Sequence, residues 1–225
     1  MSMNTVLVVA PHPDDETLGC GGTLLRHIAS GDAVHWLIVT DIQTAYGFPE
    51  VQVSLRQSQI RTVATAFCFR KVHNLGFPPA KLDTLPIGDL VSSIGQVIKE
   101  ISPTIIYLPF QGDVHTDHAT VFNAAASCTK WFRYASILRV LCYETLSETE
   151  FGLSPESTRF TPNSFVDITP YIDRKIEIAQ IYKGEMEEFP FPRSAGTLRA
   201  LAQVRGATCG CHAAESFMLL REINK

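Results

Sequence analysis

The chain alternates between short apolar runs and longer segments whose apolar residues recur every three to four positions. Residues 6–10 form an unbroken apolar run, which is typical of a strand that is buried on both faces of a parallel sheet. The same reading predicts further strands at 33–40, 71–76, 104–109, 138–144 and 164–168. Helical periodicity predicts helices at 17–30, 53–67, 88–101, 116–128, 172–182 and 195–204. Residues 213–221 carry further apolar side chains to bury.

This alternation of strands and helices predicts an α/β fold with a largely parallel sheet. The chain of 225 residues, 45% hydrophobic, is expected to form a single domain over residues 1–225. Its net charge of −4 argues against nucleic acid or an anionic membrane as the main partner, so a small-molecule substrate is expected. No secretory leader and no apolar stretch of membrane-spanning length is evident, which indicates a cytoplasmic location.

A polar cluster directly follows the first predicted strand: His12, Pro13, Asp14, Asp15 and Glu16. In an open parallel sheet, ligands bind beyond the carboxyl ends of the strands. One carboxylate here could simply cap the next helix. A histidine with three carboxylates exceeds what capping requires, so the cluster is interpreted as part of a functional site.

A second polar cluster follows the strand at 104–109. It contains Asp113, His115, Asp117 and His118, and Thr116 is expected to cap the helix that begins there. His115 and His118 are three positions apart, so both can point to one spot. If the two strands are neighbours, the two clusters form one site.

The two clusters together offer the ligands of a catalytic metal site. Two histidines and one aspartate suit Zn²⁺ with one coordination position left for water, although Fe²⁺ and other divalent ions accept the same ligands. The spacing allows His12 and Asp15 to converge on one ion with His118. Asp14 then remains as a general base beside a water whose pKa a metal lowers from about 15.7 to about 7.

The other residues of the second cluster receive supporting roles. His115 is expected to be a protonated donor that stabilises the oxyanion or protonates the leaving amine. Asp117 is expected to keep His115 charged and oriented. Asp113 is a candidate substrate contact. Arg56, just after the loop at 41–51, either is solvated or contacts an anion or hydroxyl of the substrate.

The chain resembles the PIG-L / LmbE-like zinc-dependent N-deacetylase family in several motifs. They are A-P-H-P-D-D-E and D-V-H-T-D-H in the two clusters, and L-G-F-P and P-N-S-F-V-D-I-T elsewhere. The resemblance implies a Rossmann-like three-layer α/β/α fold and hydrolysis of an N-acetyl group on an N-acetylglucosamine-type sugar, which releases acetate. It also implies that the chain can form a homo-oligomer, with the oligomeric state left open. By motif position, it assigns zinc ligands to His12, Asp15 and His118, the base to Asp14, transition-state stabilisation to His115 and a substrate contact to Arg56.

Two alternatives remain beside the deacetylase hypothesis. One is an amidase that acts on a larger acylated amino-sugar conjugate by the same chemistry. The other is a non-catalytic sugar- or nucleotide-binding α/β module, whose carboxylates only cap a helix. Against the second, the first strand leads into no G-x-G-x-x-G; Gly19, Gly21 and Gly22 follow the acidic residues inside the helix, where they are interpreted as allowing close helix–sheet packing.

Overall fold

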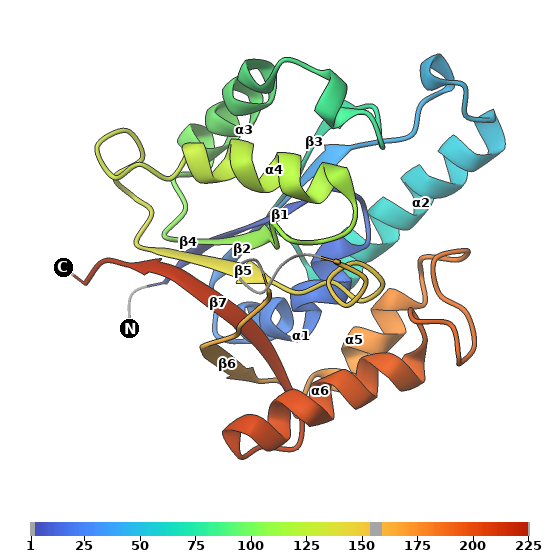
Figure 1. Cartoon of the computed structure of the whole chain (residues 1–225), viewed down its shortest axis with the longest axis vertical. Helices are drawn as coiled ribbons and strands as arrows, with labels where there is room; N and C mark the ends of the chain where they lie inside the picture. The colour runs from blue at the N-terminus through green and yellow to red at the C-terminus, as the bar shows by residue number, and fades with distance from the viewer. Residues whose placement is uncertain (1–2, 154–158, 225) are drawn as a thin grey trace.

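The computed structural model describes residues 3–153 and 159–224, and these form a seven-stranded sheet between two layers of helices (Figure 1). The strands follow one another across the sheet as β3 (Lys71–Phe77), β2 (Ala33–Thr40), β1 (Thr5–Ala10), β4 (Ile105–Pro109), β5 (Arg139–Tyr143), β7 (Ala214–Glu222) and β6 (Ser164–Asp167). Neighbours from β3 to β5 pair in parallel. This order confirms the predicted Rossmann-like α/β fold with a largely parallel sheet.

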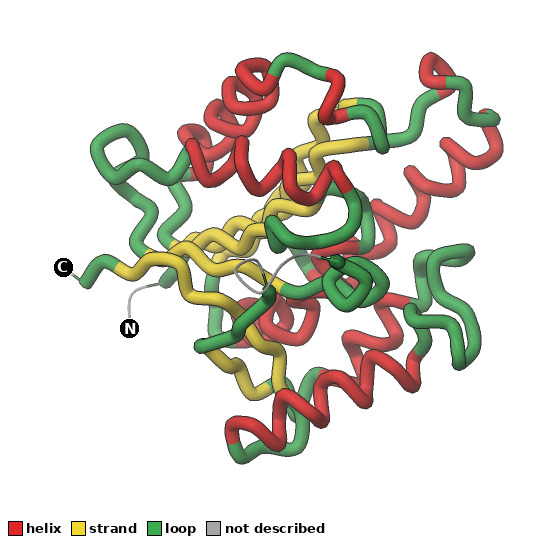
Figure 2. The backbone as a smooth tube through the Cα atoms, viewed as in Figure 1, coloured by secondary structure: helices red, strands yellow, loops and turns green. Residues whose placement is uncertain are grey.

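Helices cover both faces of the sheet, as the tube in Figure 2 shows. They are α1 (Asp15–Ala29), α2 (Glu50–Phe67), α3 (Ile87–Ile101), α4 (Thr116–Ser127), α5 (Ile172–Ala179) and α6 (Ala195–Cys209). In Figure 1, α3 and α4 lie above the sheet, and α1, α5 and α6 lie below it. Within the described ranges, none of these helices combines the length and the apolar character needed to span a bilayer.

Alternation of side chains along the buried strands divides the core into two clusters. Val6 and Val8 of β1 face the cluster that contains Phe67 of α2. Leu7 and Val9 face the opposite way, into a cluster completed by α3 and α4. Because both faces of β1 are buried, its apolar run needs no polar positions, as the sequence pattern predicts.

Glycines in α1 allow this helix to lie close to its neighbours. A Cβ atom at Gly19 would lie 2.2 Å from the ring of Tyr143, and one at Gly22 would lie 2.8 Å from the side chain of Ile168. Neither distance can be tolerated without movement of the neighbour. The structure therefore agrees with the interpretation of these glycines as packing residues.

The strand β7 enters the sheet between β5 and β6 and is antiparallel to both. The sequence indicates buried apolar side chains here, but it does not indicate this pairing. From β7, the buried carboxylate of Glu215 accepts hydrogen bonds from the backbone N–H groups of Gly22 and Thr23 and forms an ion pair with Lys175 at 2.7 Å. The last strand thus fixes the middle of α1, whose amino end carries the first polar cluster.

Candidate metal centre and active site

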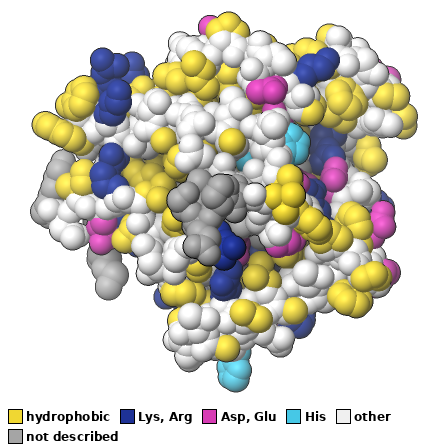
Figure 3. Space-filling model, viewed as in Figure 1, with side chains coloured by type: hydrophobic (Ala, Val, Ile, Leu, Met, Phe, Trp, Pro, Cys, Tyr) yellow, Lys and Arg dark blue, Asp and Glu magenta, His cyan; other side chains and the backbone are white. Residues whose placement is uncertain are grey.

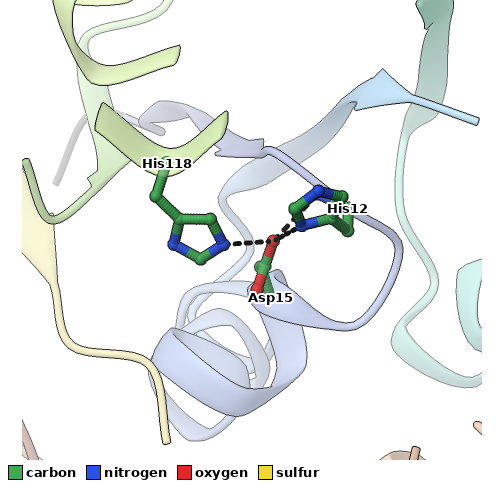
Figure 4. A group of neighbouring side chains, drawn as sticks. All are labelled: His12, Asp15 and His118. Carbon is green, nitrogen blue, oxygen red and sulfur yellow. Dashed lines mark hydrogen bonds and ion pairs between the residues drawn. The ribbon is translucent and has the colours of Figure 1, made fainter. Parts of the chain in front are cut away.

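The two polar clusters meet because β1 and β4 are adjacent parallel strands whose carboxyl ends share one edge of the sheet. His12 follows β1, Asp15 begins α1 and His118 lies in the first turn of α4. Figure 4 shows these three side chains pointing toward one another. Asp15 Oδ2 is 3.3 Å from His12 Nδ1 and 3.3 Å from His118 Nε2.

The residues present fit a metal ion. The ligand atoms of His12, Asp15 and His118 lie within 4.8 Å of one another. Two of these residues keep a buried polar atom without a hydrogen-bond partner, His118 Nε2 and Asp15 Oδ1. Unsatisfied buried polar atoms are costly unless something else binds them. A second set, His12 with His115 and Asp117, is equally close, but the unpartnered atoms favour the first.

Each histidine of the first set is held through its other ring nitrogen by a carboxylate. His12 Nε2 lies 3.0 Å from Asp117 Oδ2, and His118 Nδ1 lies 2.7 Å from Asp113 Oδ2. This arrangement leaves Nδ1 of His12 and Nε2 of His118 for a cation, and it is the usual support of metal-binding histidines.

Neighbouring carboxylates raise the pKa of both histidines. Burial opposes their charged form, but Asp117 and Asp15 outweigh it and raise the pKa of His12 to about 9. For His118, Asp15 and Asp113 outweigh burial in the same way and raise its pKa to about 10. The site therefore attracts positive charge, which a divalent cation would supply in place of the protons.

The side chains of two residues of the second cluster contact groups that the sequence does not predict. The side chain of Asp113 is buried against His118, whose Nδ1 it contacts, and it does not line the cavity beside Asp14; a contact between Asp113 and the substrate stays a prediction. The carboxylate of Asp117 contacts His12 and the backbone N–H groups of Ala80 and Leu82, rather than the ring of His115. Sequence spacing places both residues near the site but does not determine where their side chains point.

His115 caps α4, and its surroundings favour the neutral form of its ring. Its Nδ1 accepts a hydrogen bond from the backbone N–H of Asp117 at 3.1 Å, so the cap is His115 and not the predicted Thr116. Burial and the neighbouring His12 and His118 lower the pKa of His115 to about 4. These surroundings disfavour the protonated form that the sequence analysis expects. With Nδ1 accepting, a neutral ring carries its proton on Nε2, from which it can still donate.

Asp14 adopts a backbone conformation that only glycine accepts easily, with φ of 143°. Such strain costs on the order of 1–3 kcal/mol and occurs mainly at functional positions. Burial and the adjacent Asp15 raise the pKa of Asp14 to about 7, although Arg193 opposes the shift. A carboxylate with this pKa can both take up and release a proton near neutral pH.

Asp14 lines a cavity of about 450 Å³, a size typical of small-ligand pockets. His12, His115 and Arg56 line it too, together with Phe48 from the loop before α2. In Figure 3, histidine, basic and acidic side chains gather at the right of the view. The predicted residues of both clusters therefore border or support one cavity.

Besides Asp41, which directly follows β2, three charged residues of this cavity were not predicted from the sequence: Glu148, Glu185 and Arg193. Arg193 pairs with Asp14 at 2.8 Å and with Glu148 at 2.9 Å. They lie in loops after β5 and α5, where no motif marks them. The Pro- and Phe-rich composition of residues 185–193, typical of a packed lid, was the available signal.

Comparisons with known proteins agree with this geometry. A family model described as GlcNAc-PI de-N-acetylase (PIG-L) matches residues 7–129, slightly more than half of the chain. The diacetylchitobiose deacetylase of Thermococcus kodakarensis is 26% identical over 93% of this chain and 80% of its own length. A probable N-acetyl-α-D-glucosaminyl L-malate deacetylase 2 of Bacillus anthracis is 21% identical over 80% of each chain. The crystal structure of a conserved protein from Thermus thermophilus has a TM-score of 0.77, 25% identity, and covers 99% of this chain and 97% of its own.

Proposed function

The chain belongs to the PIG-L family of GlcNAc-PI de-N-acetylases, and from this membership and the site we propose a zinc-dependent N-deacetylase that acts on an N-acetylglucosamine-type sugar or sugar conjugate. The reaction hydrolyses the acetamido C–N bond and releases acetate and a free amine. The single observation that carries the proposal is the convergence of His12, Asp15 and His118 beside the cavity that His12 and Asp14 line.

In this proposal, His12 Nδ1, Asp15 and His118 Nε2 hold the cation. Two nitrogens and one carboxylate oxygen are a common ligand set of catalytic zinc. When bound, the cation polarises the amide carbonyl and makes water a better nucleophile. Asp113 and Asp117 keep the two imidazoles in the tautomers that direct these nitrogens to the ion.

Proton transfer is assigned to Asp14. Its carboxylate takes a proton from the attacking water and, with a pKa of about 7, can return it to the departing amine. His115 donates a hydrogen bond from Nε2 to the oxyanion that develops on the amide oxygen, and its neutrality leaves this role intact. Arg56 is assigned to hydroxyl groups of the substrate, since it lines the same cavity.

The experiment that tests the function combines metal analysis with acetate release. Purified protein is expected to bind about one Zn²⁺ per chain and to release acetate from N-acetylglucosaminides. His118→Ala is expected to lose both the metal and the activity. A panel of longer acyl chains on the same sugar tests the acetyl assignment: equal rates for acetyl and long acyl groups would contradict it.

A further inference from the structure

Both arginines of the cavity are already paired with carboxylates of the cavity itself. Among the described residues that line it, Arg56 and Arg193 carry the guanidinium groups, and four carboxylates accompany them. Cavities that bind anionic ligands usually offer arginine N–H groups that are free to form a bidentate pair. The occupancy of these N–H groups therefore bears on the charge of the substrate.

Each nitrogen of the Arg193 guanidinium group has a partner. Nη1 donates to Asp14 Oδ2 at 2.8 Å and to Glu185 Oε2 at 3.4 Å. Nη2 donates to Glu148 Oε1 at 2.9 Å, and Nε donates to Ser147 Oγ at 2.6 Å. Its charge thus faces three carboxylates, and no edge of the group is left for a phosphate or carboxylate of a ligand.

Arg56 has a partner at each of its two Nη atoms. Nη1 donates to the backbone oxygen of Pro13 at 3.0 Å, and Nη2 forms an ion pair with Glu185 Oε1. Glu185 therefore gives one carboxylate oxygen to each arginine. The side chains of Arg56 and Arg193 are only 17% and 15% exposed, so water screens these pairs weakly.

We propose that Glu185 determines the charge of the substrate: by neutralising Arg56 and Arg193, it makes the cavity select uncharged N-acetylglucosaminides over conjugates that carry a phosphate or carboxylate. The proposal rests on the proposed deacetylase function. A charged substituent in the cavity would meet the carboxylates of Glu148 and Asp41, while the charges of both guanidinium groups already face Glu185. Such repulsion is a common source of discrimination between ligands.

The first test compares two substrates of similar size with the zinc-loaded protein, methyl N-acetyl-β-glucosaminide and N-acetylglucosamine 1-phosphate. We expect kcat/KM to favour the uncharged sugar by at least about tenfold in the unmodified protein. Glu185→Gln removes one negative charge beside both arginines, and it is expected to reduce this preference by about fivefold or more. Glu188→Gln is the matched control, because this exposed carboxylate lies in the same loop outside the cavity; it should leave the preference unchanged.

The second test measures binding without catalysis, so that it remains informative if deacetylation fails. Calorimetric titration of the same variants with methyl β-glucoside and glucose 1-phosphate should show tighter binding of the phosphate alone in Glu185→Gln. A preference of the unmodified protein for the phosphorylated sugar in both tests would overturn the role of Glu185, and so would equal effects of Glu185→Gln on both sugars. Failure to release acetate from either substrate would instead overturn the deacetylase function.

Discussion

The carboxylate of Asp113 offers the sharpest test of the metal centre, because it contacts His118 and does not line the cavity. Its Oδ2 lies 2.7 Å from His118 Nδ1, and both side chains are almost completely shielded from water. Loss of such a support typically weakens metal binding by about 10–100-fold. Asp113→Asn keeps an acceptor but loses the charge, so we expect about a tenfold loss, near 1.4 kcal/mol. Asp113→Ala leaves the N–H without a partner, and about a hundredfold loss is expected.

The assay is competition between the protein and a chelator for Zn²⁺ at fixed pH, with thermal unfolding as a check that each variant is folded. Asp41→Asn serves as the control, since Asp41 lines the same cavity but is bound by Gln57 and Asn74 rather than by a histidine. Its zinc affinity should stay within about twofold of the unmodified protein. Unchanged affinity in Asp113→Ala, or an equal loss in Asp41→Asn, would refute the assignment of His118 as a supported ligand.

Four further substitutions, one of them a control, test other parts of the structure. Asp14→Asn should keep its zinc but lower kcat for acetate release by about 10²–10⁴-fold, so full activity would exclude it as the base. Gly22→Ala, whose Cβ would lie 2.8 Å from a neighbouring side chain, should lower the free energy of denaturant unfolding by about 1–3 kcal/mol. Gly88→Ala, in a helix with open space around it, should not destabilise, and a similar loss in both would contradict the packing argument. Lys175→Met leaves Glu215 buried without its cation and should cost about 3–5 kcal/mol of unfolding free energy, whereas a neutral result would show that the pair contributes little.

The sequence predicts the centre of this site well because the relevant information is local. The apolar run before His12 identifies a strand buried on both faces, and the run before His118 identifies another. A parallel sheet places the ends of its strands at one edge, so adjacency of β1 and β4 suffices to bring the two clusters together. The fold class follows from the period of the pattern, whereas the meeting of the clusters also requires that β1 and β4 are neighbours, which the structure shows.

The surroundings of the site are less predictable because they depend on the directions of side chains and on loops. Asp113 and Asp117 lie within five residues of His118, yet the structure directs one to His118 and the other to His12. Arg193 reaches Asp14 across 179 positions of the chain, from a loop whose composition indicates a lid but not a charge. Neither periodicity nor spacing specifies such contacts.

The position of β7 has a consequence for how the protein is made. Every predicted metal ligand is synthesised within the first 118 residues, but β5 and β6 each keep an unpaired edge until residues 214–222 emerge and pair between them. Unpaired strand edges are templates for wrong partners. The nascent chain thus carries its predicted metal ligands long before its sheet can close, and its protection from aggregation during translation depends on residues 214–222, which emerge much later than these ligands.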